Sequence, residues 1–200
     1  PSRGLNIEQM SYSLKEFGFG TRIYSREEYG NNFENILSCY IESGIPLIVA
    51  VETPKTITPR IGHAMLCTGY EPRQDYMIDS LIETFIHSQK LKNAITSKNI
   101  KIFDNDDLRR KFIFIDDNFP AYQKNSLNKP CENYDPKKFL NWDTCILTHF
   151  LSPLYSKIYL ETFQAKSFVR RFLIEGKGSL PNNSNVFLRT FLTSSRSYKN

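Results

Sequence analysis

Two short apolar runs, each bounded at one end by polar side chains, constrain this chain more than any other feature. Gly62-His63 opens the run Ala64-Met65-Leu66-Cys67, and the run Phe112-Ile113-Phe114-Ile115 stops at Asp116-Asp117. Short apolar runs that are bounded in this way are typical of buried strands. A histidine at the beginning of one strand and a carboxylate at the end of another can meet at one edge of a sheet. We therefore expect an imidazole–carboxylate pair, in which the carboxylate fixes the tautomer of the ring and stabilises its charged form.

The carboxylate partner of His63 is one of two adjacent residues. Because side chains alternate along a strand, only one of Asp116 and Asp117 can point toward the imidazole. We favour Asp116, which directly follows the strand, and keep Asp117 as the alternative. The competing interpretation is that Asp116-Asp117-Asn118 is an ordinary turn sequence and that His63 is a structural histidine.

A nucleophilic cysteine would complete a Cys-His-Asp apparatus, but none of the four cysteines is an obvious candidate. Cys39 falls near the C-terminal end of a predicted helix, where the helix dipole raises the pKa of a thiol. Cys67 lies in an apolar strand, and we expect both of these side chains to be packed in the core. Cys131 and Cys145 lie in or near loops after Asp116, and nothing in the sequence singles them out as nucleophiles.

Hydrophobic periodicity and turn residues predict the remaining elements. Asn6 and Gln9 form a capping-box pattern at the start of a helix that ends near Gly18. The order of helices and strands along the chain predicts an α+β domain with an antiparallel sheet. The other expected segments are an extended piece at 21–24, a helix at 32–43, a strand at 45–51, a loop at 52–61, a strand at 64–70, a strand or none at 76–78, a helix or excursion at 80–92, a charged solvated stretch at 104–111, a loop at 118–136, an ambiguous apolar stretch at 144–151, a helix at 154–174 and a strand at 185–193.

Composition narrows the classes of protein and of partner. Apolar residues make up 40% of the chain and aromatic residues 14%, which is enough to build a core. The net charge of +5 is spread along the chain, so we expect a solvated surface and not a nucleic-acid interface. His87 and His149 have no partner at metal-ligand spacing, and neither a metal nor another cofactor is expected. Because the sequence has no long apolar run and no signal peptide, we expect no membrane span and a cytoplasmic protein. The sequence does not indicate an oligomeric state.

Four motifs, taken in order, resemble the papain-like cysteine peptidase superfamily and, within it, the C39-peptidase-like family. They cover residues 4–122 and are Gly4-Leu5 to Phe17-Gly18, Tyr40-Ile41-Glu42-Ser43-Gly44-Ile45-Pro46-Leu47-Ile48, Gly62-His63-Ala64, and Phe112-Ile113-Phe114-Ile115-Asp116-Asp117. The resemblance implies a papain-like fold, in which helices pack on an antiparallel sheet. It also implies thiol-dependent hydrolysis of a peptide or protein substrate. By this resemblance His63 is the catalytic base, and Asp116 or Asp117 orients it.

In that family the nucleophilic cysteine and an oxyanion-hole glutamine lie before the segment that matches Gly4-Leu5. We interpret Pro1-Ser2-Arg3 as a loop within a longer protein. We therefore expect a core at residues 1–122 that lacks its nucleophile helix, and an extension at 123–200, with a helix and a strand, that packs on the same domain. The isolated chain is then an inactive peptidase domain. The alternative is a catalytically inactive relative that binds a peptide or protein.

Overall fold

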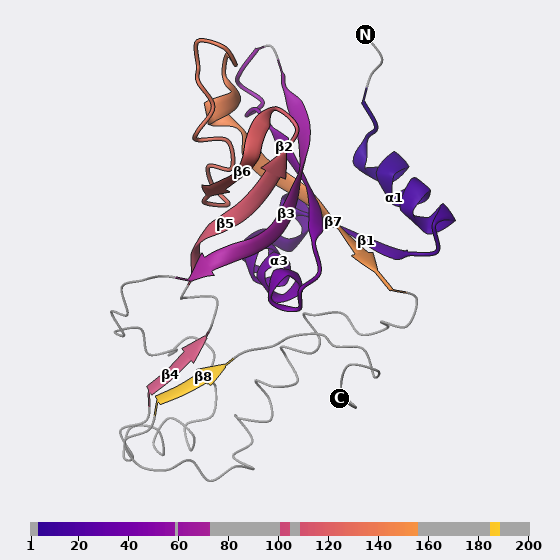
Figure 1. The fold of residues 1–200 in the computed structure, drawn as a ribbon, viewed down its shortest axis with the longest axis vertical. Coiled ribbons are helices and arrows are strands. Elements are labelled where there is room, and N and C mark those ends of the chain that lie inside the picture. The colour runs from indigo at the N-terminus through magenta and orange to yellow at the C-terminus, as the bar shows by residue number, and fades with distance from the viewer. Residues whose placement is uncertain (1–3, 59, 73–100, 105–108, 156–184, 189–200) are drawn as a thin grey trace.

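The computed structural model of this chain has an α+β architecture built around a six-stranded sheet (Figure 1). It describes residues 4–58, 60–72, 101–104, 109–155 and 185–188. In the sheet, strands lie in the order β1-β7-β2-β3-β5-β6, and each neighbouring pair is antiparallel. The predicted fold class and antiparallel sheet are confirmed. The strands of this sheet are β1 (Gly20–Ser25), β2 (Leu47–Glu52), β3 (Gly62–Pro72), β5 (Arg109–Asp116), β6 (Phe119–Asn125) and β7 (Ile146–Leu154), while β4 (Lys101–Asp104) and β8 (Asn185–Leu188) form a separate parallel pair.

The two predicted N-terminal helices are confirmed as α1 (Ile7–Glu16) and α3 (Phe33–Glu42). The capping box of α1 is present, because the Gln9 backbone N–H donates to Asn6 Oδ1 at 2.8 Å and the Asn6 backbone N–H donates to Gln9 Oε1 at 2.9 Å. A short helix α2 (Arg26–Tyr29) follows β1. Within the described ranges, no helix has the length and apolar character that crossing a bilayer requires.

The core lies between α3 and one face of the sheet. Side chains of β2 alternate, so that Leu47, Val49 and Val51 are buried while the residues between them are partly exposed. At the centre of the core, Phe150 of β7 stacks on Tyr24 with a ring-centroid distance of 4.7 Å. The opposite face of β2 is less covered, and this asymmetry leaves room for a groove on that side of the sheet.

Three sequence-based predictions differ from the structure. The loop predicted at 118–136 is wrong in its first part, which forms β6, because that strand buries polar side chains and so lacks the expected hydrophobic alternation. In the charged stretch at 104–111, which is predicted to be solvated, the last residues begin β5 and Lys111 is exposed. The strands predicted at 45–51 and 64–70 overlap β2 and β3, but their ends are shifted, because turn residues mark strand ends only loosely.

The C-terminal part of the sheet is continuous with the N-terminal part. The ambiguous stretch at 144–151 forms most of β7, which lies between β1 and β2. The boundary drawn at residues 122/123 falls inside β6. The segments 76–78 and 80–92, the predicted helix beyond residue 155, and the strand at 185–193 beyond β8 lie outside the described residues.

Candidate active site

The ends of two adjacent strands bring His63 and Asp116 together. His63 is the second residue of β3 and lies opposite Val51 of β2. Asp116 is the last residue of β5, which pairs with the other edge of β3. His63 Nε2 and Asp116 Oδ1 lie 2.9 Å apart, with the two side chains 15% and 0% exposed. An almost fully buried carboxylate therefore forms a direct hydrogen bond with a histidine that solvent can still reach.

Asp117, the alternative partner, lies at the rim of the same site. Its Oδ1 is 3.5 Å from His63 Nε2, and its side chain is 84% exposed. At that distance and exposure the contact is weaker than the hydrogen bond to Asp116. Asp116 is therefore the carboxylate that fixes the ring, while Asp117 adds negative charge nearby.

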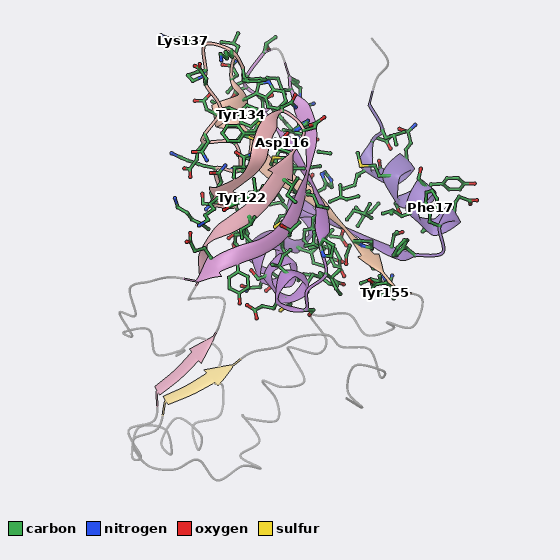
Figure 2. The ribbon with its side chains drawn as sticks, viewed as in Figure 1. Phe17, Asp116, Tyr122, Tyr134, Lys137 and Tyr155 are labelled. Atoms are coloured by element: carbon green, nitrogen blue, oxygen red, sulfur yellow. The ribbon has the colours of Figure 1, made fainter. Side chains whose placement is uncertain are left out.

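Both carboxylate oxygens of Asp116 accept hydrogen bonds, and the donors include groups other than His63. Oδ1 accepts from the Asn118 backbone N–H at 2.9 Å, and Oδ2 accepts from Gln123 Nε2 at 3.4 Å. The Tyr134 hydroxyl also donates to Oδ2. Figure 2 labels Tyr134 and Asp116. Burial raises the pKa of Asp116, but the hydrogen bonds from His63, Tyr134 and Asn118 outweigh it and lower the pKa to about 2. Asp116 is therefore negatively charged at neutral pH.

The pKa of His63 is raised above its usual value. Burial lowers this pKa, but the hydrogen bond with Asp116 and the negative charges of Asp116 and Asp117 outweigh the effect. The Trp142 ring packs on the imidazole with a centroid distance of 5.0 Å. Within the described part of the chain, the ring has its one hydrogen-bond acceptor, Asp116 Oδ1, at Nε2. With the proton held at Nε2 by Asp116, Nδ1 carries the lone pair that can accept a proton.

We expect His63 to stabilise the folded protein more in mild acid than in alkali. The pKa of His63 is higher in the folded protein than in the unfolded chain, where it is about 6.5. The contribution of His63 to the free energy of unfolding is therefore fully present below the unfolded pKa and is lost as the pH rises through the folded pKa. In urea unfolding, His63→Gln should lower the free energy of unfolding more at about pH 5.5 than at about pH 9. An equal loss at the two pH values would mean that the charged imidazole gains nothing from its carboxylate neighbours.

All four cysteines of the chain are buried thiols that form no disulfide with one another. Burial raises the pKa of Cys67 to about 12, and Cys39 packs in the core as expected. The hydrogen bond between the thiols of Cys131 and Cys145 raises the pKa of Cys131 and lowers that of Cys145, which the positive charge of His63 lowers further. Cys145 is nevertheless only 1% exposed. No thiol of this chain is therefore accessible to a substrate in the folded structure.

His63, Asp116 and Asp117 also form a candidate set of metal ligands. One ligand atom from each of His63, Asp116 and Asp117 lies within 4.8 Å of the others. However, the oxygens of Asp116 already accept hydrogen bonds from four donor groups, and the proton on Nε2 points at Oδ1. A cation would have to displace these donors, so the arrangement fits an imidazole–carboxylate pair better than a metal centre.

Sequence reasoning missed the aromatic residues that hold the pair in place. The rings of Tyr134 and Trp142 stack with a centroid distance of 4.9 Å, and one contacts Asp116 while the other contacts His63. Both come from the segment between β6 and β7, where no periodicity marks them. The available signal is that large aromatic side chains recur in a segment rich in Pro and Asn, where a solvated loop would not require them.

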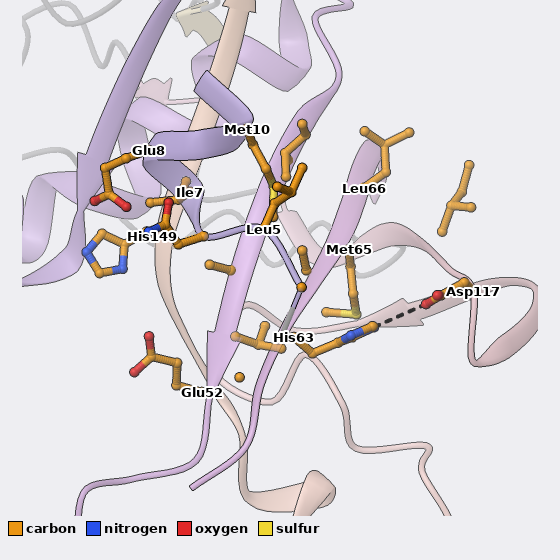
Figure 3. Close-up of a pocket in the computed structure, with 18 residues that line it drawn as sticks. Leu5, Ile7, Glu8, Met10, Glu52, His63, Met65, Leu66, Asp117 and His149 are labelled. Atoms are coloured by element: carbon orange, nitrogen blue, oxygen red, sulfur yellow. Dashed lines mark ion pairs between the residues drawn. The ribbon is translucent and has the colours of Figure 1, made fainter. Parts of the chain in front are cut away.

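A groove of about 820 Å³ opens beside His63, on the less covered face of the sheet (Figure 3). In this view Asp117 lies on one side of His63, and Glu8, Glu52 and His149 lie on the other. Glu52 is opposite Gly62, the residue before His63, in the pairing of β2 with β3. The rest of the lining is mainly apolar and comes from the N-terminal segment with α1 and from β2 and β3. The imidazole can therefore contact a ligand that occupies the groove.

Comparisons of the chain with protein-family models, curated proteins and solved structures found no match.

Proposed function

We propose that this chain is a papain-like cysteine-peptidase domain, in which His63 is the general base and Asp116 orients it. The observation that carries the proposal is the hydrogen bond of 2.9 Å between His63 Nε2 and the buried Asp116 Oδ1, next to an open groove. A base that acts on a thiol needs a fixed tautomer, a free ring nitrogen and a nearby negative charge. His63 has these three properties.

The proposed reaction is the hydrolysis of an amide bond in a peptide or protein. His63 Nδ1 takes the proton of a cysteine thiol, and the charge of Asp116 stabilises the resulting imidazolium. The thiolate forms a bond with the amide carbonyl carbon, and His63 returns the proton to the leaving amine as the C–N bond breaks. Water then attacks the thioester, giving up a proton to His63, and releases the acid and the thiol.

We propose that the attacking thiol belongs to a segment outside these 200 residues. All four cysteines of the chain are buried, so none of them can reach a substrate in the folded protein. A thiol-reactive peptide-like probe should therefore leave Cys39, Cys67, Cys131 and Cys145 of the folded chain unlabelled. The longest gene product that contains this chain should be labelled at another cysteine, and His63→Ala should abolish that labelling. Labelled sites are identified by peptide mass spectrometry.

Two results would contradict this assignment. Labelling of Cys145 in the folded chain, lost in His63→Ala, would place the nucleophile inside the chain, because His63 lowers the pKa of that thiol. Labelling of the longer product that persists in His63→Ala would remove the proposed role of the base. The control is Glu27→Ala, an exposed residue of α2 outside the groove, which should label like the unmodified protein.

The second candidate is a peptide-binding module that performs no chemistry. The burial of every thiol in the chain favours it, since the groove needs no nucleophile to hold a ligand. For this candidate, the longer product has no probe-reactive cysteine that depends on His63, and His63→Ala leaves peptide binding intact. Because the four cysteines form no disulfide with one another, as is usual in a reducing compartment, we propose a cytoplasmic location for either candidate.

A further inference from the structure

Two of the buried cysteines, Cys131 and Cys145, are in contact with each other. The thiol of Cys131 donates a hydrogen bond to the sulfur of Cys145. The two residues are 0% and 1% exposed and belong to the same core cluster. A disulfide joins sulfur atoms about 2.05 Å apart, so it forms most readily between thiols that the fold already holds together.

The backbone next to each of these cysteines is anchored. Asn125 Nδ2 donates to the carbonyl of Pro130, the residue before Cys131, at 2.6 Å. The backbone N–H of Cys145 donates to the Trp142 carbonyl at 3.0 Å, and β7 begins at the next residue. The contact between the thiols therefore joins two fixed points of the chain.

The chain between the two cysteines carries the aromatic residues that contact the candidate active site. The Tyr134 hydroxyl donates to Asp116, and the Trp142 ring packs on His63. Figure 1 shows the segment between β6 and β7, to which these residues belong, at one end of the sheet. A disulfide between its two ends would close this stretch into a short loop and would restrict the unfolded chain.

The four thiols of the chain differ in their readiness to react. Cys39 lies in α3 and Cys67 in β3, and both are buried. Burial raises the pKa of Cys67 to about 12, which suppresses its thiolate. The hydrogen bond from Cys131 and the positive charge of His63 lower the pKa of Cys145. Oxidants react with the thiolate, so Cys145 is the thiol that we expect to react first.

We propose that a peroxide oxidises Cys131 and Cys145 to an intrachain disulfide, which ties the segment between β6 and β7 to the start of β7. The Cys145 sulfur attacks hydrogen peroxide, the O–O bond breaks, and a sulfenic acid forms as hydroxide leaves. The Cys131 sulfur then attacks the sulfenic sulfur. The S–S bond forms, the S–O bond breaks, and the leaving hydroxide takes the Cys131 proton to become water. In total the two thiols lose two electrons and two protons, and the peroxide becomes two waters.

Because both thiols are buried, the oxidant reaches them when the surrounding segment opens locally. Residues 126–145 contain one short helix, η4 (Trp142–Thr144), and no strand, so this opening breaks no hydrogen bonds of the sheet. Small thiols reduce the disulfide by exchange after the same opening. A reversible bond of this kind suits a reducing compartment, where protein disulfides are usually transient. The inference does not rest on the proposed peptidase function.

The test treats the folded chain with hydrogen peroxide at neutral pH. The product is unfolded, its remaining thiols are alkylated, and it is digested without reductant for mass spectrometry. We expect one peptide pair joined through Cys131 and Cys145, with Cys39 and Cys67 alkylated as thiols. Dithiothreitol before alkylation should return all four cysteines to thiols. The oxidised chain should unfold at a urea concentration about 1 M higher than the reduced chain.

Substitution of single cysteines supplies the controls. Cys39→Ala and Cys67→Ala each remove a buried thiol outside the pair, and both variants should still form the joined peptides. Cys145→Ala removes one member of the pair, so peroxide should produce no joined peptides and no increase in its urea midpoint.

Four alkylated thiols after peroxide treatment would overturn the inference. Joined peptides that contain Cys39 or Cys67, a bond between two copies of the chain on a non-reducing gel, or a lower urea midpoint after oxidation would overturn it as well. The result is distinct from that of the labelling experiment. A Cys131–Cys145 bond without His63-dependent labelling of the longer product would retain the disulfide and reject the peptidase, and the opposite pair of results would do the reverse.

Discussion

Replacing His63 with alanine should lower amide hydrolysis by about 10³-fold or more in the longer gene product that we propose carries the attacking thiol. The variant loses the group that takes the thiol proton and returns it to the leaving amine, and general acid–base catalysis contributes on this scale. The measurement is kcat/KM on a peptide substrate. The KM should change less than kcat, because His63 acts on the reacting atoms and is only one of the residues that line the groove.

The same assay can contradict the proposed role of His63. A loss of less than about tenfold in His63→Ala would be too small for a general base. The Glu27→Ala variant, altered on the exposed surface of α2, should retain the unmodified rate. Circular dichroism of both variants tests whether they are folded, so that a loss of activity is not assigned to unfolding.

Replacing Asp116 with alanine should lower the free energy of unfolding by about 3 kcal/mol, whereas Asp117→Ala should change it by less than about 0.5 kcal/mol. The Tyr134 hydroxyl and the Gln123 amide both donate to buried Asp116 and would lose their acceptor. Asp117 is 84% exposed and leaves no buried donor behind. Urea unfolding at neutral pH measures both values.

These two aspartates are a matched pair, because they are the same residue type at adjacent positions. A similar loss in both variants would show that the buried hydrogen-bond network gives Asp116 no larger effect on stability than exposed Asp117 has. A small loss in Asp116→Ala would show that the network does not stabilise the fold. Asp116→Asn is a second variant that keeps the size of the side chain, and its loss should lie between the other two, since the amide oxygen can still accept one of the donors.

Local sequence signals were sufficient for the first helix and for the pair at the strand ends. The Asn6–Gln9 capping box involves atoms only three residues apart, so the sequence shows it directly. His63 and Asp116 are distant in sequence, but each marks the end of a clear apolar run. The juxtaposition of two such ends could be predicted because neighbouring strands bring their ends together.

The strand β6 could not be predicted from its hydrophobic pattern. Gln123 and Asn125 are 2% and 0% exposed, while Tyr122, the residue before Gln123, is 56% exposed. The alternation is reversed because the buried amides have partners in the fold: Asn125 Nδ2 donates to Gln123 Oε1 at 2.9 Å and to the Pro130 carbonyl at 2.6 Å. Burial of polar groups is tolerated when they are hydrogen-bonded, and the sequence does not reveal those partners.

The support of the site by Tyr134 and Trp142 depends on tertiary structure in the same way. These residues lie in an irregular segment, and their roles arise from the path that this segment takes past Asp116 and His63. A spacing rule for helices or strands does not apply there. Their importance follows only once the sheet has fixed the positions of the histidine and the carboxylate.

The most direct test of the account is a nitrogen-15 NMR titration of the His63 imidazole in the unmodified chain, Asp116→Asn and Asp117→Asn. We predict a pKa above about 6.5 in the unmodified chain, because the charge of Asp116 outweighs the effect of burial. Asp116→Asn should lower this pKa markedly and Asp117→Asn only slightly. A larger decrease in Asp117→Asn, or no decrease in either variant, would contradict the pairing of His63 with Asp116.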